Sequence, residues 1–139
     1  MGGYSVREFV DDDAPRVIKL WTSVFGYDAA HNAPAFALAK KLEVQRELFF
    51  VACVGESIIG TVMGGYDGHR GWIYSLAVLP EARTGGVGTA LMTRCEEALK
   101  AVGCFKINLQ VAADNDGVVK FYEKLGYSVE PRISMGKRV

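Results

Sequence analysis

The sequence predicts an α/β domain with a mixed, mostly antiparallel sheet of six to seven strands and helices on both faces. Apolar runs typical of strands occur between segments with helical periodicity. The glycine-containing segments "VGES" and "YDGHRG" join consecutive apolar runs as hairpins, whose strands are antiparallel. Further along the chain a strand, a helix and a strand follow one another, and this order requires a parallel pair.

The first third of the chain predicts one strand and two helices. Residues 4–10 alternate in polarity and read as a strand. The helix that follows begins at the acidic run 11–13, which offers an N-cap, and ends at Gly26. A second helix is expected over residues 34–46. The apolar face of the first helix, with Trp21 interpreted as core, consists of Val17, Ile18, Trp21, Val24 and Phe25.

The remaining elements alternate between strands and helices. Three hairpin-linked strands occupy residues 47–80, and the third runs from Trp72 to Val78. A helix over 86–102, ended by Gly103, leads to a strand over 105–111. A short helix then begins at Asn115, its expected N-cap, and ends at Gly126. One or two strands over 127–138 complete the sheet.

Composition limits the class of protein. The 139 residues fit a single domain, 1–139, and the 16 basic and 16 acidic residues balance. This balance argues against non-specific nucleic-acid binding. No apolar run approaches the ~18 residues of a membrane span, and the N-terminus is no signal peptide, so we expect a cytoplasmic protein without membrane partners. The three cysteines match no zinc or redox spacing, so no metal is expected; Cys53 and Cys95 are predicted as buried, reduced thiols.

The segment "RTGGVGTA", residues 83–90, lies between a predicted strand and a helix. Glycines at a helix N-terminus leave backbone N–H groups open to a phosphate, although they can also serve only a tight turn. A P-loop needs a lysine after its last glycine, but Thr89 and Ala90 follow Gly88. The dinucleotide fingerprint fails as well, because Leu91 occupies the position of its third small residue.

Several motifs together resemble one family. "RTGGVGTA" matches the Arg/Gln-x-x-Gly-x-Gly/Ala signature of the GNAT superfamily of N-acetyltransferases. "LAVLPEAR" before it and "DNDGVVKFYEKLGY" further on are similar to that family's strand and second motif. "GTVMGGYDGHRG" resembles the small bacterial YpeA-like acetyltransferases within it. The resemblance covers nearly the whole chain and implies the acyl-CoA N-acyltransferase fold.

The resemblance also implies a cosubstrate and a set of site residues. Acetyl-coenzyme A would donate its acetyl group to a primary amine that attacks the thioester directly. Tyr122 matches the family's general acid, and the backbone N–H of Val78 is the implied oxyanion donor. The residues implied to bind the coenzyme are Leu76, Ala77, Val78, Arg83, Thr84, Gly85, Gly86, Val87, Gly88, Thr89, Asn115 and Tyr122.

The resemblance identifies the amine acceptor and the general base less clearly than the coenzyme site. Gln110 stands where some relatives have a glutamate, and an amide cannot accept a proton usefully, so no base is named. We expect the acceptor to be a small-molecule or peptide amine, and a homodimer is compatible with the sequence. The alternative function is a non-catalytic coenzyme A-binding sensor. Candidate acceptor-pocket residues are Tyr27, His31, Tyr66, His69 and Tyr74.

Overall fold

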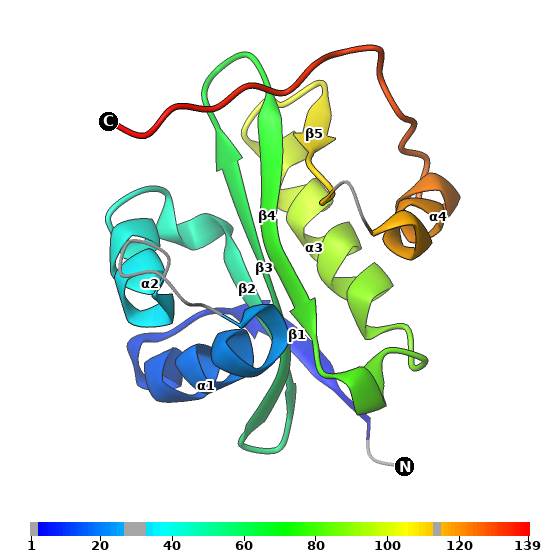
Figure 1. The fold of residues 1–139 in the computed structure, drawn as a ribbon. Helices are drawn as coiled ribbons and strands as arrows, with labels where there is room; N and C mark the ends of the chain where they lie inside the picture. The colour runs from blue at the N-terminus through cyan, green and yellow to red at the C-terminus, as the bar shows by residue number, and fades with distance from the viewer. Residues whose placement is uncertain (1–2, 27–32, 113–114) are drawn as a thin grey trace.

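The computed structural model describes residues 3–26, 33–112 and 115–139. Its sheet has five strands in the order β1-β2-β3-β4-β5 (Figure 1). The first four strands pair antiparallel, whereas β4 and β5 are parallel. The strands are β1 (Ser5–Glu8), β2 (Phe49–Val54), β3 (Ser57–Tyr66), β4 (Gly71–Val78) and β5 (Ile107–Leu109). The predicted mixed, mostly antiparallel sheet is therefore confirmed.

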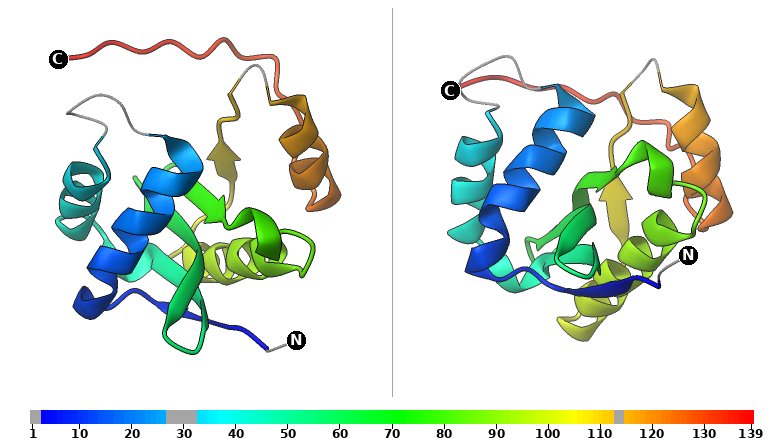
Figure 2. Two further views of the ribbon diagram at one scale, coloured as in Figure 1. Left: turned by 60° about the horizontal axis from the view of Figure 1, so that its bottom comes forward. Right: turned by 90° about the horizontal axis from the view of Figure 1, so that it is seen from below.

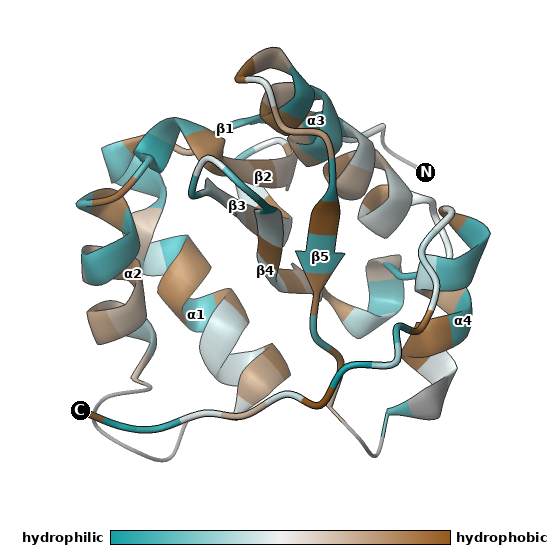
Figure 3. Ribbon diagram, turned by 90° about the horizontal axis from the view of Figure 1, so that it is seen from above, coloured by the Kyte–Doolittle hydropathy of each residue, from teal (hydrophilic) through white to brown (hydrophobic). Residues whose placement is uncertain are grey.

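Helices cover both faces of the sheet, as predicted (Figure 2). On one face lie α1 (Ala14–Phe25) and α2 (Pro34–Leu42), and on the other lie α3 (Val87–Ala101) and α4 (Asp116–Lys124). Apolar and polar residues alternate along α1 in Figure 3, as expected for a helix with one buried face. In the described residues, short 3-10 turns at Asp11–Asp13, Arg46–Leu48 and Pro80–Ala82 join these elements.

Strand β2 divides the core into two layers, because successive strand residues point to opposite faces. Phe49 and Val51 pack with Trp21 of α1, whereas Phe50 contacts the layer built by Leu91 and other residues of α3. All five side chains are almost completely buried. Trp21 is thus a core residue, as predicted. Cys53 and Cys95 are also buried and free, which confirms the interpretation of both as structural thiols.

The acidic run before α1 connects the first strand to the first helix. Asp13 is buried, and its carboxylate accepts hydrogen bonds from Arg7 Nη1 at 2.7 Å and from the Val10 amide at 2.9 Å. Burial alone would raise the pKa of Asp13, but the hydrogen bonds from Arg7 and Val10 outweigh it and hold that pKa below its ordinary value. Asp13 occupies the N-cap position of α1 without a capping hydrogen bond to that helix.

Helix α2 ends at Leu42, four residues earlier than predicted, because Gln45 adopts a left-handed backbone with φ 51°. This turn directs the Gln45 side chain at the end of β3. Its Nε2 donates to the Tyr66 carbonyl and its Oε1 accepts from the Tyr66 amide, both at 2.9 Å. On the same edge, Lys41 Nζ donates to the carbonyl of Gly64 at 2.6 Å. Two side chains therefore occupy the part of β3 that β2 does not reach.

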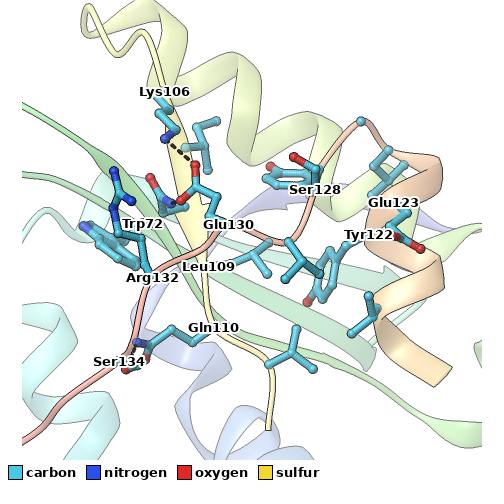
Figure 4. Close-up of a pocket in the computed structure, with 18 of the residues that line it drawn as sticks. Trp72, Lys106, Leu109, Gln110, Tyr122, Glu123, Ser128, Glu130, Arg132 and Ser134 are labelled. Atoms are coloured by element: carbon cyan, nitrogen blue, oxygen red, sulfur yellow. Dashed lines mark hydrogen bonds and ion pairs between the residues drawn. The ribbon is translucent and has the colours of Figure 1, made fainter. Parts of the chain in front are cut away.

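The predicted strands over 127–138 are wrong for the described structure, which has five strands instead of six or seven. β5 is likewise shorter than the predicted 105–111. The C-terminal segment runs beside β5 but contacts it through side chains: Glu130 pairs with Lys106, and Ser134 accepts from Gln110 at 2.5 Å (Figure 4). Pro131 lies between these contacts and has no N–H to donate to a strand ladder.

We expect Gly71→Ala to destabilise the fold by about 1 to 2 kcal/mol, because overpacking a buried site strains its neighbours. A Cβ at Gly71 would lie 2.7 Å from Cys104 Sγ and 3.3 Å from Leu99 Cδ1. The melting temperature should fall by several degrees in a thermal scan. Gly65→Ala is the matched control, since a Cβ there meets its nearest atoms at 3.6 and 3.8 Å. Equal melting temperatures for the two variants would contradict the expectation.

Candidate active site

The sheet opens along β4. β4 pairs with β5 only from Gly71–Ile73 to Ile107–Leu109, although β4 continues to Val78. The register between β3 and β4 shifts between Thr61 and Met63, and Ser75 has φ 50°, so β4 carries a bulge there. In the described part of the chain, β4 has no strand partner on this side beyond Ile73 (Figure 1). Its backbone is therefore available to a ligand.

A cavity of about 320 Å³ occupies this opening. One wall is β4, another is β5 with the residues after it, and helices α1 and α4 contribute the rest. Its lining combines apolar side chains with the phenols of Tyr74 and Tyr122 and the amides of Gln110 and Asn115. The residues that line it are Phe25, Trp72, Ile73, Tyr74, Ser75, Leu76, Leu109, Gln110, Val111, Ala112, Asn115, Val118 and Tyr122.

Tyr122 extends from α4 toward β5 (Figure 4). Its ring packs edge-on against Phe121 at 5.1 Å and Tyr127 at 5.9 Å between ring centroids, and these contacts hold it in place. Its hydroxyl hydrogen-bonds to no other residue in the described part of the chain. Burial raises the pKa of Tyr122 above its ordinary value of about 10. The phenol consequently keeps its proton at neutral pH and can donate it.

The glycine-rich segment forms the start of α3. Gly86 is the N-cap, with φ 81°, a left-handed conformation that favours glycine. Within the described ranges, the amides of Gly86, Val87, Gly88 and Thr89 donate no backbone hydrogen bond, whereas the Gly85 amide donates to Ala82. Open N–H groups at a helix N-terminus suit an anion. The open amides are fewer than the residues predicted to bind the coenzyme, and their binding of a phosphate stays a prediction.

Two neighbours explain why this segment lies close to both β4 and α4. Arg83 Nε donates to the carbonyl of Val78 at 3.0 Å, which ties the loop to the end of β4. A Cβ at Gly88 would lie 3.2 Å from Phe121 Cζ, so any larger residue at position 88 would require the Phe121 ring of α4 to move slightly. Thr84 and Thr89 are exposed on the outer surface of the segment.

The structure brings several predicted site residues together. Leu76, Asn115 and Tyr122 line the same cavity, and Asn115 is the N-cap of α4, as predicted, although its side chain makes no capping hydrogen bond. Val78 is not among the residues that line it. The Leu79 amide donates to Ile59 of β3 at 2.9 Å, so the Val78 amide faces the opposite edge of β4. Ala77 is buried in the core layer of α1 and pairs with Thr61 of β3, so it does not line the cavity.

The acceptor candidates fall into three groups. Tyr74 lines the cavity and is half exposed, and its pKa is raised by burial and by the charge of Asp67. Tyr66 and His69 lie on the β3–β4 hairpin and do not line the cavity. The Tyr66 hydroxyl shares its one proton between the carbonyls of Gly68 and Gly103, each at 3.3 Å, and His69 is exposed. Tyr27 and His31 lie outside the described residues.

Sequence reasoning missed part of the site. Phe25, which was predicted to lie on the apolar face of the first helix, is 41% exposed at the end of α1 and lines the cavity together with Trp72. A larger cavity of about 1190 Å³ lies between β5, α4 and the C-terminal segment, which adds Glu130 and Arg132 to its wall (Figure 4). No sequence signal indicated it, because the segment that forms one wall was expected to pair as a strand.

Within the ranges that the structure describes, no three or more His, Cys, Asp or Glu side chains gather in a way that could hold a metal ion. No described helix combines the length and apolar character that a membrane crossing requires.

Comparisons with known proteins agree with this geometry. The model of the Acetyltransferase (GNAT) family matches residues 9–127. An acetyltransferase of Yersinia pestis is 45% identical over 134 residues, which cover 96% of this chain and 94% of the relative. The crystal structure of Ard1 from Thermoplasma volcanium has a TM-score of 0.79 and 29% identity over 91% of this chain and 84% of its own. PaiA N-acetyltransferase from Thermoplasma acidophilum, solved in complex with coenzyme A, has a TM-score of 0.79 at 20% identity and covers 94% of this chain and 93% of its own.

The family match and the acetyltransferase relatives identify this chain as an N-acetyltransferase, in which the sheet opens at a bulge in β4 and a glycine-rich helix start follows that strand. The chain belongs to the GNAT family.

Proposed function

We propose that the enzyme transfers the acetyl group of acetyl-coenzyme A to a primary amine by direct attack on the thioester. One observation carries the proposal: the Tyr122 phenol lines a cavity on the unpaired edge of β4, and the open amides of the α3 N-terminus follow the end of the same strand. The solved PaiA N-acetyltransferase, which has the same fold, is in complex with coenzyme A. No metal is part of the proposed chemistry.

The proposed coenzyme site has two parts. The amides of Gly86 to Thr89 would bind the pyrophosphate, because four open N–H groups at a helix start attract negative charge. Arg83, Thr84 and Gly85 would flank it. The amide-containing pantetheine would lie along β4 from Leu76 to Val78, as an added strand would, and would meet Asn115 on the opposite wall.

The proposed reaction needs three events at one carbon. The amine nitrogen forms a bond to the thioester carbonyl, a tetrahedral oxyanion develops, and the carbon–sulfur bond then breaks. Tyr122 gives its proton to the leaving thiolate and regains one from solvent. The extra proton of the amine passes to water, because Gln110 on the cavity wall cannot accept it.

The oxyanion donor has two candidates. The Val78 amide is predicted from the family pattern and faces the open edge of β4, whereas Leu76 lines the cavity together with Tyr122. We keep Val78 as the proposed donor and Leu76 as its alternative. A crystal structure with bound acetyl-coenzyme A separates them by which amide lies within hydrogen-bond distance of the thioester oxygen.

We propose Tyr74 as a wall of the acceptor site, since it lines the cavity and is half exposed. Tyr66 and His69 remain candidates for the outer rim.

Three free cysteines support a reducing compartment, and hence the proposed cytoplasmic location. The proposed homodimer is tested by light scattering.

A panel of primary amines tests the proposed function directly. Purified protein is mixed with acetyl-coenzyme A and each amine, and release of free thiol is followed. We expect at least one amine to raise thiol release well above the rate without acceptor. Binding of coenzyme A by calorimetry, with no amine-dependent release for any small-molecule or peptide amine, would favour the alternative of a non-catalytic coenzyme A-binding sensor.

A further inference from the structure

A buried hydrogen-bond chain crosses the core and ends at the bulge of β4. Trp21 Nε1, on α1, donates to Thr61 Oγ1, on β3, at 2.8 Å. Thr61 Oγ1 in turn donates to the carbonyl of Ser75, on β4, at 3.1 Å. Trp21 and Thr61 are completely buried, with 0% exposure each. Thr61 is one of only two buried polar or charged residues among the described ones, the other being Asp13.

The direction of this chain is determined by chemistry. An indole N–H only donates, and a carbonyl oxygen only accepts. The Thr61 hydroxyl has one proton, so it can satisfy both partners only by accepting from Trp21 and donating to Ser75. Trp21 therefore orients the hydroxyl, and the hydroxyl holds the Ser75 carbonyl.

Ser75 needs such a restraint. Its φ of 50° places a non-glycine residue in the left-handed region, which costs about 1 to 2 kcal/mol. The register shift of β4 against β3 occurs at the same point, between Thr61 and Met63. Pairing with β5 ends at Ile73, two residues before Ser75. The strained residue therefore lies where β4 no longer pairs with β5 and runs along the cavity wall.

We propose that Trp21 and Thr61 are positioning residues for acetyl transfer. They touch neither substrate, but they hold the bulge that aims the backbone of Leu76 to Val78 at the thioester. This inference rests on the proposed role of the β4 edge. The glycine-rich segment at residues 83–89 lies outside the chain of hydrogen bonds. Loss of the chain should therefore impair the reaction far more than coenzyme binding.

A role in packing alone makes a different prediction. Trp21 stacks on Phe49 with centroids 5.8 Å apart and an interplanar angle of 11°, and phenylalanine keeps an aromatic ring in that stack. Valine has nearly the shape of threonine but no hydroxyl, and serine keeps the hydroxyl while losing a methyl group. If Thr61 only filled space, valine would be the milder replacement and serine the more harmful one.

The experiment compares Thr61→Val, Thr61→Ser, Trp21→Phe and the double variant Trp21→Phe/Thr61→Val. For Thr61→Val we expect kcat to fall about 10- to 100-fold, with the Kd for coenzyme A changed less than about threefold. Thr61→Ser should keep most of the wild-type kcat. Trp21→Phe should lower kcat by about three- to tenfold. The double variant should be no worse in kcat than Thr61→Val, because both changes break one chain.

Three outcomes would each overturn the inference. The first is a wild-type kcat in Thr61→Val, and the second is a greater loss of kcat in Thr61→Ser than in Thr61→Val. The third is a fall of kcat in the double variant equal to the product of the falls in the two single variants. A readout without turnover separates it from the proposed function. In ¹⁵N NMR spectra, Thr61→Val should shift the amide signals of Leu76 and Val78 and leave those of Gly86 and Gly88 in place. Unmoved signals at both β4 positions would also overturn it, whereas a wild-type protein inactive on every amine would overturn only the proposed function.

Discussion

Replacing Tyr122 by phenylalanine is expected to lower kcat for acetyl transfer about 100-fold or more, while the Kd for coenzyme A changes less than about threefold. The change removes only the hydroxyl that would protonate the leaving thiolate. The ring contacts with Phe121 and Tyr127 remain. Thiol release gives kcat, and calorimetry with coenzyme A gives the Kd. Unchanged turnover would remove Tyr122 from the role of general acid.

Tyr127→Phe is the matched control for this prediction. Tyr127 lies edge-on to Tyr122, but its hydroxyl donates to Glu96 Oε2 at 2.5 Å and does not line the β4 cavity. Its loss should lower the melting temperature and leave kcat within about threefold of wild type. An equal fall of kcat in both variants would mean that Tyr122→Phe acts through packing.

The pKa of Tyr122 adds a dependence on pH. Burial disfavours the phenolate, so the pKa of Tyr122 is raised above about 10. The proton that the acid donates is present below that pKa and is lost as the pH rises through it. We therefore expect the decline of kcat from Tyr122 ionisation to occur at a higher pH than the pKa of an ordinary phenol, which is about 10. Tyr122→Phe should lack that decline.

Replacing Gly85 by glutamate is expected to raise the Kd for coenzyme A about 10- to 100-fold, because it puts a carboxylate beside the proposed pyrophosphate site. Gly85 has room for the change: a Cβ there meets its nearest atom, the Ala82 carbonyl oxygen, at 3.6 Å. The fold should therefore be retained. Calorimetry measures the Kd, and the rise of melting temperature that coenzyme A gives the wild type should largely disappear.

Gly85→Ala is the control, since it adds a Cβ without a charge and should bind coenzyme A nearly as wild type does. High salt should reduce the difference between the two variants, because it screens exposed charges. A glutamate variant that binds coenzyme A as tightly as the alanine variant would show that the pyrophosphate lies elsewhere.

The fold was predictable where local patterns decide it. Gly26 and Gly126 end their helices with φ of 62° and 99°, a conformation that glycine adopts without a Cβ penalty. The tail was not predictable in this way. Residues 127–138 alternate as a strand does, yet alternation says nothing of whether a neighbouring edge is free to pair, and Pro131 interrupts any ladder.

The site was predictable in its residues more than in its shape. Leu76 is far in the sequence from Asn115 and Tyr122, yet all three line one cavity, as the family pattern implies. The bulge at Ser75 had no signal, because a serine at φ 50° is set by tertiary contacts such as the hydrogen bond from Thr61. The position of Trp21 on the helix predicts its packing in the core, but not the hydrogen bond that its indole N–H donates to Thr61.

The side chains of Lys41 and Gln45 at the end of β3 have a consequence for behaviour in concentrated solution. β3 continues to Tyr66, past the last residue that β2 can pair. An overhanging strand offers unsatisfied amides and carbonyls to a foreign chain, which is the first step of edge-to-edge aggregation. Here a side-chain amide imitates one residue of a neighbouring strand and an ammonium places a charge beside it. The exposed end of the hairpin is thereby closed to intermolecular β-pairing along this edge.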